Sequence, residues 1–303
     1  MRISIIKYSF LIILLPIVSF SQSKLDSFLK TSDTLNKSRR NAVAVSEAFI
    51  GAITLVGLNQ LWYADFERSK FQTINDNNEW LQMDKLGHVF TSYQLGKYGA
   101  QLLNWSGVSE SNQLLYGATL GFTFLSAVEV LDGYSEEWGF SWGDILANGA
   151  GTSFYIGQEI LWKEQRVALK YSFHQTKFAK QRPEKLGENG LEQILKDYNG
   201  QTYWLSANLH SFFKASKIPK WLNVAVGYGG DGMLRGTKIV NNQSLTIDNR
   251  YRQYYLSLDL NLNGIKTNSK LLRSIFDVLN MIKIPFPTLE FNKKRVAFHL
   301  FYY

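Results

Sequence analysis

Four apolar segments of helical length dominate the first half of the chain. They cover residues 41–66, 86–105, 112–132 and 143–162. Each is close to the roughly 20 residues that cross a bilayer, and each is rich in Gly, Ala and Ser, which permit close packing of helices. Because each also carries polar side chains, a buried helix of a soluble bundle fits equally well. The pattern predicts about four helices and leaves open whether they span a membrane.

Near Trp162 the pattern changes from helical to alternating. The run QYYLSLDLNLNGI starts at Gln253. Within it, Tyr254 and four leucines share one face. Polar side chains occupy most of the other face. This period of two predicts a strand with one apolar and one polar side.

Other parts of the second half show weaker signals of the same kind. Further strands are expected within 166–174, 203–213, 221–229 and 286–292. Residues 271–283 predict a short helix that ends before Pro285 and Pro287. Lipid-facing strands of the outer-membrane kind would alternate similarly and end on an aromatic residue. Because clear strands are few, a small sheet attached to the helices is the preferred interpretation.

The sequence therefore predicts an α+β protein. An N-terminal apolar bundle of about four helices is followed by a smaller antiparallel β-rich region. The expected divisions are a signal peptide at 1–21, a flexible polar segment at 22–40, the helical bundle at 41–165 and the β-rich C-terminal region at 166–303.

The first residues have the composition of a secretory signal. Arg2 and Lys7 precede an apolar stretch, and Ser19-Phe20-Ser21 is a small-x-small cleavage pattern. An uncleaved anchor is the alternative. The chain contains no Cys, which excludes disulfides and thiolate chemistry and also the lipid-carrying Cys of a lipoprotein. We expect an exported protein of the periplasm or the envelope membrane that is not a lipoprotein.

The charge narrows the class of partner. The formal net charge of +8 is spread along the chain, and no compact basic block interleaved with aromatic residues is found. We therefore expect no nucleic-acid partner. Attraction to an anionic membrane surface is the preferred explanation of this positive charge. A general contribution to solubility is the alternative. The aromatic content of 15% suits a lipid interface. Protein partners are not indicated.

Three polar motifs interrupt the apolar segments. They read Asp-Lys-x-x-His, Glu-x-x-Asp and Asp-x-x-x-Asn, and each places its members on one helical face. Burying such groups is costly unless they are paired or bound to something. If the faces converge, one polar site holds an imidazole, an ammonium and several carboxylates. The candidate residues are Asp84, Lys85, His88, Glu129, Asp132, Asp144 and Asn148.

This residue set permits more than one chemistry. It suits a divalent cation, acid–base work, or a phosphate held by Lys85 and His88. If a metal is bound, His88, Glu129 and Asp144 are its expected ligands, although no metalloprotease spacing is present. Helix caps, with Ser141 available as the N-cap before Asp144, and internal salt bridges are the structural alternative. The GxGxxG match at 227–232 is interpreted as a glycine-rich hairpin loop because no helix pattern follows it. No catalytic residue or cofactor is assigned.

The runs DKLGHVFTSYQ and VEVLDGYSEEWGFSWGDILANGAG carry a family resemblance. Over residues 45–165 the chain resembles the YfiM-like family of uncharacterised envelope proteins, many of them predicted periplasmic lipoproteins. The polar spacing is also similar to that of VanZ-like membrane proteins. The first resemblance implies an envelope location without an established activity. The second implies membrane helices and, for its namesake, an association with glycopeptide-antibiotic resistance.

Two functional hypotheses follow. In the first, the protein is a membrane-associated envelope protein whose polar cluster has a structural or binding role. In the alternative, it is an enzyme or binding protein for a lipid or cell-wall precursor headgroup. There His88, Glu129 and Asp144 would be acid–base groups or cation ligands, and Lys85 would contact a phosphate.

Overall fold

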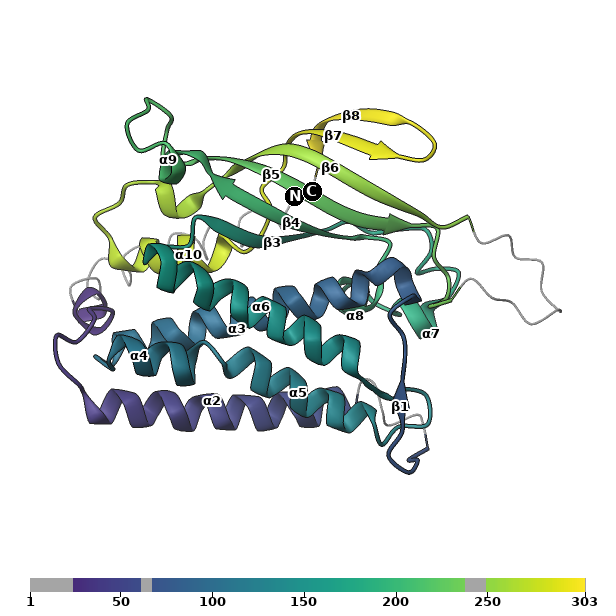
Figure 1. The fold of residues 1–303 in the computed structure, drawn as a ribbon, viewed down its shortest axis with the longest axis horizontal. Helices are drawn as coiled ribbons and strands as arrows, with labels where there is room; N and C mark the ends of the chain where they lie inside the picture. The colour runs from purple at the N-terminus through teal and green to yellow at the C-terminus, as the bar shows by residue number, and fades with distance from the viewer. Residues whose placement is uncertain (1–23, 61–66, 238–248, 303) are drawn as a thin grey trace, which may run out of the picture.

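The computed structural model describes residues 24–60, 67–237 and 249–302. The expected signal peptide lies outside the described residues, as does the last part of the first apolar segment. The described chain is α+β, with helices on one side and a six-stranded antiparallel sheet on the other (Figure 1).

Long helices form the N-terminal half. They are α2 (Lys37–Leu58), α3 (Met83–Trp105), α5 (Leu120–Asp132) and α6 (Trp142–Trp162), with α4 (Glu110–Asn112) and the π-helical turn η3 (Gln113–Gly117) leading into α5. Small residues set the spacing of α3, α5 and α6. A Cβ on Gly121 would lie 2.2 Å from the carbonyl oxygen of Ser92, and one on Gly151 would lie 2.1 Å from that of Val89. Gly149 makes no such close approach, since a Cβ there would have only the Phe122 ring nearby, at 3.9 Å.

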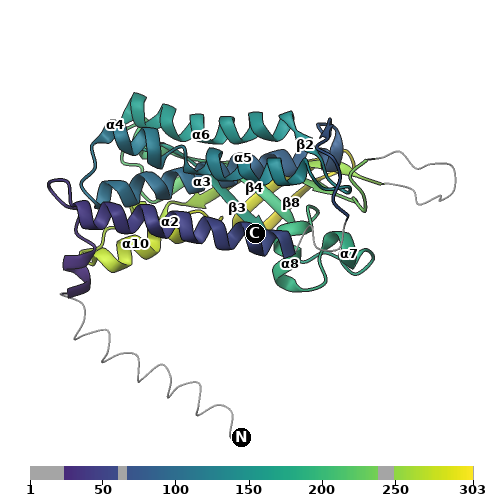
Figure 2. The same ribbon diagram turned by 90° about the horizontal axis from the view of Figure 1, so that it is seen from below.

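Helix α2 differs from the expected bundle. It runs along the outer side of the helices (Figures 1 and 2), and Val43 is its one buried side chain. Phe49, Ile50 and Ile53 are exposed. A bundle of four buried helices is therefore not shown. The physical reason is that apolar residues surround α2, so contact along one side leaves the others uncovered.

Within the part of the chain that the structure describes, two helical stretches have the length and hydropathy of a membrane span. They are Lys37–Leu58 and Glu110–Asp132. The first is almost entirely exposed in the molecule, whereas the second is partly buried against its neighbours.

The sheet is a meander in which each strand pairs with the next. Its order is β3 (Val167–Phe173), β4 (Gln201–Asn208), β5 (Leu222–Asp231), β6 (Tyr251–Leu260), β7 (Phe286–Asn292) and β8 (Val296–Tyr302). Short helices join the strands: α7 (Pro183–Leu186), α8 (Gly190–Lys196), α9 (Leu209–Phe212), η4 (Leu262–Gly264) and α10 (Lys270–Leu279). Helix α10 matches the short helix predicted before Pro285.

One strand prediction and one loop prediction need correction. The expected run 203–213 is divided between β4 and α9, because the Asn208 side chain accepts a hydrogen bond from Ser211 N and caps the helix. The glycines interpreted as a hairpin loop lie mostly inside β5. Gly227 is required there because a Cβ would stand 2.6 Å from the Trp204 ring. Only Gly232, at φ 79°, occupies a turn.

The sheet curls around one of its faces. Trp204 in β4 and Tyr302 in β8 lie four strands apart, about 19 Å in a flat sheet, yet their ring centroids are 6.0 Å apart. The Tyr302 hydroxyl also donates a hydrogen bond of 2.7 Å to Tyr255 in β6. We call this concave side the inner face and the opposite side the outer face. At β3 and β4 the outer face packs on α3 through contacts such as Tyr203 with Phe90, 5.9 Å between ring centroids.

In a sheet with one face in water, the apolar face is buried and the polar face is exposed. Here the two are exchanged. The inner face buries an ion pair, in which Lys170 Nζ lies 2.8 Å from Asp259 Oδ2 and Ser206 donates to the same oxygen. Lys283 Nζ lies 3.8 Å from the other Asp259 oxygen. Burial lowers the pKa of Lys283 to about 8, partly offset by the Asp259 charge. Beyond α3, the outer face carries exposed apolar side chains.

The helix crossing of α3 and α5 yields the first prediction. Gly121→Ala should lower the free energy of unfolding by about 1–3 kcal/mol, because the added methyl meets the Ser92 backbone, which cannot move alone. Gly157→Ala in α6 is the control, since nothing lies within 4 Å of its added Cβ. It should stabilise the protein by about 0.5–1 kcal/mol. Denaturant unfolding of both variants in mild detergent measures the difference, and equal stabilities would contradict the close approach.

Candidate functional site

A largely buried lysine, with 14% of its side chain exposed, lies at the centre of the polar site. Strand β1 (Thr73–Ile74) pairs in parallel with β2 (Phe140–Ser141), which brings the segment after β1 to the start of α6. Lys85 Nζ then lies 2.6 Å from Asp76, 2.9 Å from Asp144 and 3.3 Å from Asp84. Three carboxylates from three segments thus surround one ammonium group.

His88 occupies the next turn of α3. Its Nδ1 is 3.0 Å from the Asn148 side-chain oxygen in α6. With that oxygen as the acceptor, Nδ1 carries the hydrogen and the opposite nitrogen faces the acids. His88 Nε2 is 3.6 Å from Glu129 and 3.7 Å from Asp144. Both separations exceed a hydrogen bond, so these contacts are electrostatic.

Hydroxyl and amide groups tie the acids to the backbone. Ser141 caps α6 by accepting from Asp144 N, as its position predicted, and its hydroxyl donates to Asp76 at 2.6 Å. Ser141 N donates to Glu129 at 3.0 Å. The Tyr198 hydroxyl, from the segment before β4, donates to Asp84 at 2.6 Å. Every acid in contact with Lys85 or His88 therefore has a further neutral or charged partner.

The structure brings most of the predicted site residues together. Asp132 lies at the end of α5, and its negative charge acts on Glu129 by raising its pKa. Sequence reasoning missed Asp76 and Tyr198 and gave Ser141 a capping role alone. Asp76 sits in a polar loop without periodicity, and Tyr198 lies in the C-terminal half, so neither had a helical signal. The predicted residues that meet are Asp84, Lys85, His88, Glu129, Asp144 and Asn148.

A left-handed turn precedes α3 and aims its first residues at the site. In η2 (Glu79–Gln82), the residues Trp80, Leu81 and Gln82 have φ of 45°, 53° and 66°. Non-glycine residues pay about 1–2 kcal/mol each for this conformation. Backbone and side-chain contacts hold the turn: Trp80 N donates to Gly236 O at 2.8 Å, and the Tyr228 hydroxyl donates to Leu81 O at 2.6 Å.

Burial and the neighbouring charges together set the pKa values of the ionisable groups. Burial raises the pKa of Glu129 to about 8 and, together with the Asp84 charge, raises that of Asp144 to about 6. Burial alone would lower the pKa of His88, but the surrounding carboxylates raise it above its ordinary value. Burial would raise the pKa of Asp84, yet the His88 and Lys85 charges and the Tyr198 hydrogen bond lower it. At neutral pH the site therefore favours the neutral form of Glu129, while the surrounding carboxylates favour the protonated form of His88.

The donor set compatible with a metal differs from the predicted one. One donor atom each from Asp84, His88 and Asp144 lies within 4.8 Å of the others, so Asp84 takes the place expected for Glu129. Imidazole with carboxylates suits several divalent metals. The Lys85 ammonium already contacts two of these acids, however, and its positive charge would oppose a second cation.

One comparison with known proteins covers this site. Residues 74–157 match the model of a family described as predicted periplasmic lipoprotein (DUF2279). No curated protein and no solved structure matches the chain. The chain is thus similar to an uncharacterised periplasmic family, which supports an envelope location. The description gives no support to the expectation that the chain is not a lipoprotein, and it names no activity.

The central lysine yields the second prediction. Lys85→Met should lower the free energy of unfolding by about 3–5 kcal/mol, because it leaves the buried Asp144 and the partly buried Asp76 and Asp84 facing one another without their cation. Lys163→Met is the control, since Lys163 forms an exposed ion pair with Glu110 and should contribute about 0–1 kcal/mol. Denaturant unfolding at pH 7 compares them. A loss for Lys85→Met no larger than the control would show that the network contributes little to stability.

Glu129 yields the third prediction. Its pKa of about 8 in the folded protein exceeds the ordinary 4.5, so the folded state binds the extra proton between these pH values. Its favourable contribution is complete below pH 4.5 and is lost as pH rises through 8. Glu129→Gln keeps the neutral form, so wild type should lose stability relative to this variant by a few kcal/mol between pH 5 and 8.5, on the order expected from the shift.

The control for this pH dependence is Glu136→Gln at an exposed site. Its difference from wild type should stay flat across the same range. Unfolding curves at five or six pH values measure both differences. A flat Glu129→Gln difference would mean that Glu129 is ionised in the folded protein.

Proposed function

We propose that this chain is a membrane-associated protein of the cell envelope whose polar cluster holds the fold together from within. One observation carries the proposal: charged groups are buried while large apolar side chains are exposed. In a protein surrounded by water this arrangement is costly on both counts. Against lipid, the exposed apolar groups gain a favourable environment.

The outer face of the sheet is the largest such surface. Its exposed side chains lie on neighbouring strands from β5 to β8 and are between 38% and 66% accessible. Soluble monomers rarely expose contiguous apolar patches larger than a few hundred Å². The side chains concerned are Val226, Tyr254, Leu256, Leu258, Leu289, Phe291, Val296 and Phe298.

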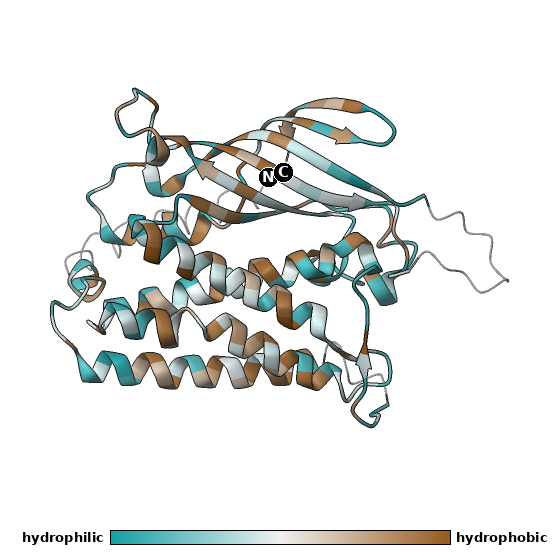
Figure 3. Cartoon of the chain, viewed as in Figure 1, coloured by the Kyte–Doolittle hydropathy of each residue, from teal (hydrophilic) through white to brown (hydrophobic). Residues whose placement is uncertain are grey.

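Helices add apolar surface of the same kind (Figure 3). On α2, Phe49 and Ile50 are exposed, and on α6 Leu146 and Leu161 are more than 70% accessible. The net charge of +8 and the aromatic content favour an anionic lipid interface. The envelope location supported by the family description provides such a membrane.

The contacts of Lys85 support a structural role for the cluster. An ammonium group has three hydrogens to donate, and three carboxylates already surround this one. A phosphate contact through Lys85, as in the headgroup-enzyme alternative, would require breaking one of these pairs. An internal network therefore fits the geometry better than a phosphate site at this position.

Membrane association yields the fourth prediction. Wild-type protein should float with phosphatidylcholine vesicles. Double variants Ile50→Asp/Ile53→Asp on α2 and Leu256→Asp/Phe298→Asp on the sheet should each reduce partition at least about tenfold, since a buried apolar side chain contributes about 1.5–3 kcal/mol. All four side chains are exposed, so unfolding in detergent should change by no more than about 0.5 kcal/mol per site.

The matched control is Gln175→Glu/Asn268→Asp, which adds the same two negative charges at exposed loop positions. It should float like wild type. Wild-type protein that remains in the soluble fraction, or apolar-face variants that partition like the control, would contradict the proposal.

A further inference from the structure

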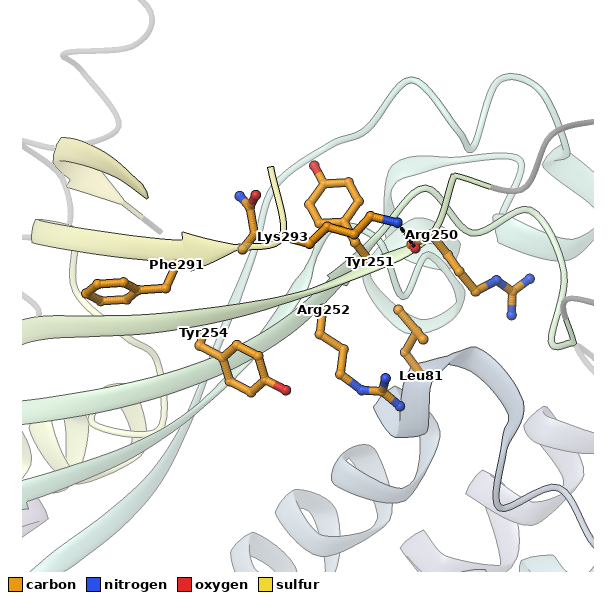
Figure 4. A pocket seen from close by; sticks show the side chains of 8 residues that line it. Leu81, Arg250, Tyr251, Arg252, Tyr254, Phe291 and Lys293 are labelled. Carbon is orange, nitrogen blue, oxygen red and sulfur yellow. Dashed lines mark hydrogen bonds between the residues drawn. The ribbon is translucent and has the colours of Figure 1, made fainter. Parts of the chain in front are cut away.

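A pocket of about 470 Å³ lies where β6 and β7 meet the left-handed turn before α3 (Figure 4). Three of its lining residues are cationic, and none of the described residues that line it is a carboxylate. The residues around it are Leu81, Arg250, Tyr251, Arg252, Tyr254, Phe291, Asn292 and Lys293.

The cationic side chains are held by neutral acceptors. The Arg250 guanidinium donates to the backbone carbonyls of Gly236 and Thr237 at 2.7 and 2.8 Å, which fixes its position. Arg252 donates to the Tyr228 hydroxyl at 3.0 Å and to the Gln82 amide oxygen at 2.7 Å. These contacts orient both guanidinium groups, and the two named partners of Arg252 are neutral.

Lys293 completes the group of cations. Its Nζ donates to the Arg250 carbonyl at 3.2 Å (Figure 4). Among the described residues, neither Arg252 nor Lys293 forms an ion pair with a carboxylate. Positive charge without a matching acid at the wall of a pocket favours an anionic ligand.

The pocket opens directly onto the apolar outer face. Tyr254 and Phe291 are cross-strand partners at its wall, and Leu256 pairs with Leu289 two positions farther along. From Arg252 to Leu258 the strand spans about 20 Å. Half of the roughly 30 Å hydrocarbon core of a bilayer is about 15 Å. A bound amphiphile could place its head at the arginines and lay its chains along this strip.

We infer that this pocket binds the phosphate headgroup of an anionic phospholipid, whose acyl chains lie on the outer face of the sheet. Arg252 and Lys293 supply charge to the phosphate oxygens, and the anchored Arg250 guanidinium lies beside them. The inference rests on the proposed membrane association, because the chains need the exposed strip. It goes further by assigning a lipid class and a headgroup site separate from the Lys85 cluster.

The fifth prediction compares two vesicle compositions. Partition of wild type into vesicles with 30% phosphatidylglycerol should exceed partition into pure phosphatidylcholine by at least about tenfold. Arg252→Gln/Lys293→Gln should remove most of that gain while keeping binding to pure phosphatidylcholine. Both side chains are exposed, so the variant should unfold like wild type in detergent.

Lys217→Gln/Lys220→Gln is the matched control, with the same loss of two charges at exposed positions before β5. General attraction contributes about 1 kcal/mol per basic residue near an anionic surface, so any effect of these control charges measures the non-specific part. A loss in the pocket variant no larger than in the control overturns the headgroup site. Saturation of the pocket by inorganic phosphate without any preference for phosphatidylglycerol vesicles overturns the lipid assignment. Failure to bind either vesicle type overturns the proposed membrane association itself.

Discussion

Pairing of buried charge is the constraint on which the rest of this structure depends. Lys85 joins the start of α3 to the segment after β1 and to the start of α6 through Asp76 and Asp144. Lys170 and Asp259 do the same across the curled sheet, from β3 to β6. A charge left alone in either place would cost several kcal/mol. The two networks therefore require particular segments, far apart along the chain, to meet.

The buried polar interior and the apolar exterior are two consequences of one alternation. Along β6, placing Ser257 and Asp259 on the concave side necessarily turns Leu256 and Leu258 outward, because successive side chains of a strand point to opposite faces. A soluble protein would reverse the register. The inverted arrangement is stable where lipid replaces water at the outer face. The cationic pocket at the end of that face then lies where headgroups would meet the strip.

The candidate site was predicted in part because its helices supply most of it. The i, i+3 spacing of Lys85 and His88 in α3 and the i, i+4 spacing of Asp144 and Asn148 in α6 put each pair on one helical face, and the two faces meet. Asp76 and Tyr198 could not be found in this way. Asp76 reaches the site through the parallel pairing of β1 with β2, and Tyr198 through docking of the sheet region on α3. Both contacts are non-local and leave no periodic pattern.

The sequence by itself determined the α+β class, the helical and alternating segments, the absence of cysteine chemistry and the faces that carry polar groups. These follow from periodicity and composition, which act locally. Only the tertiary structure decided that α2 lies exposed, that the sheet curls until Tyr302 reaches Trp204, and that three arginine and lysine side chains share one pocket. Each of these depends on which surfaces pack together, and packing sums many weak contacts between residues that the chain holds far apart.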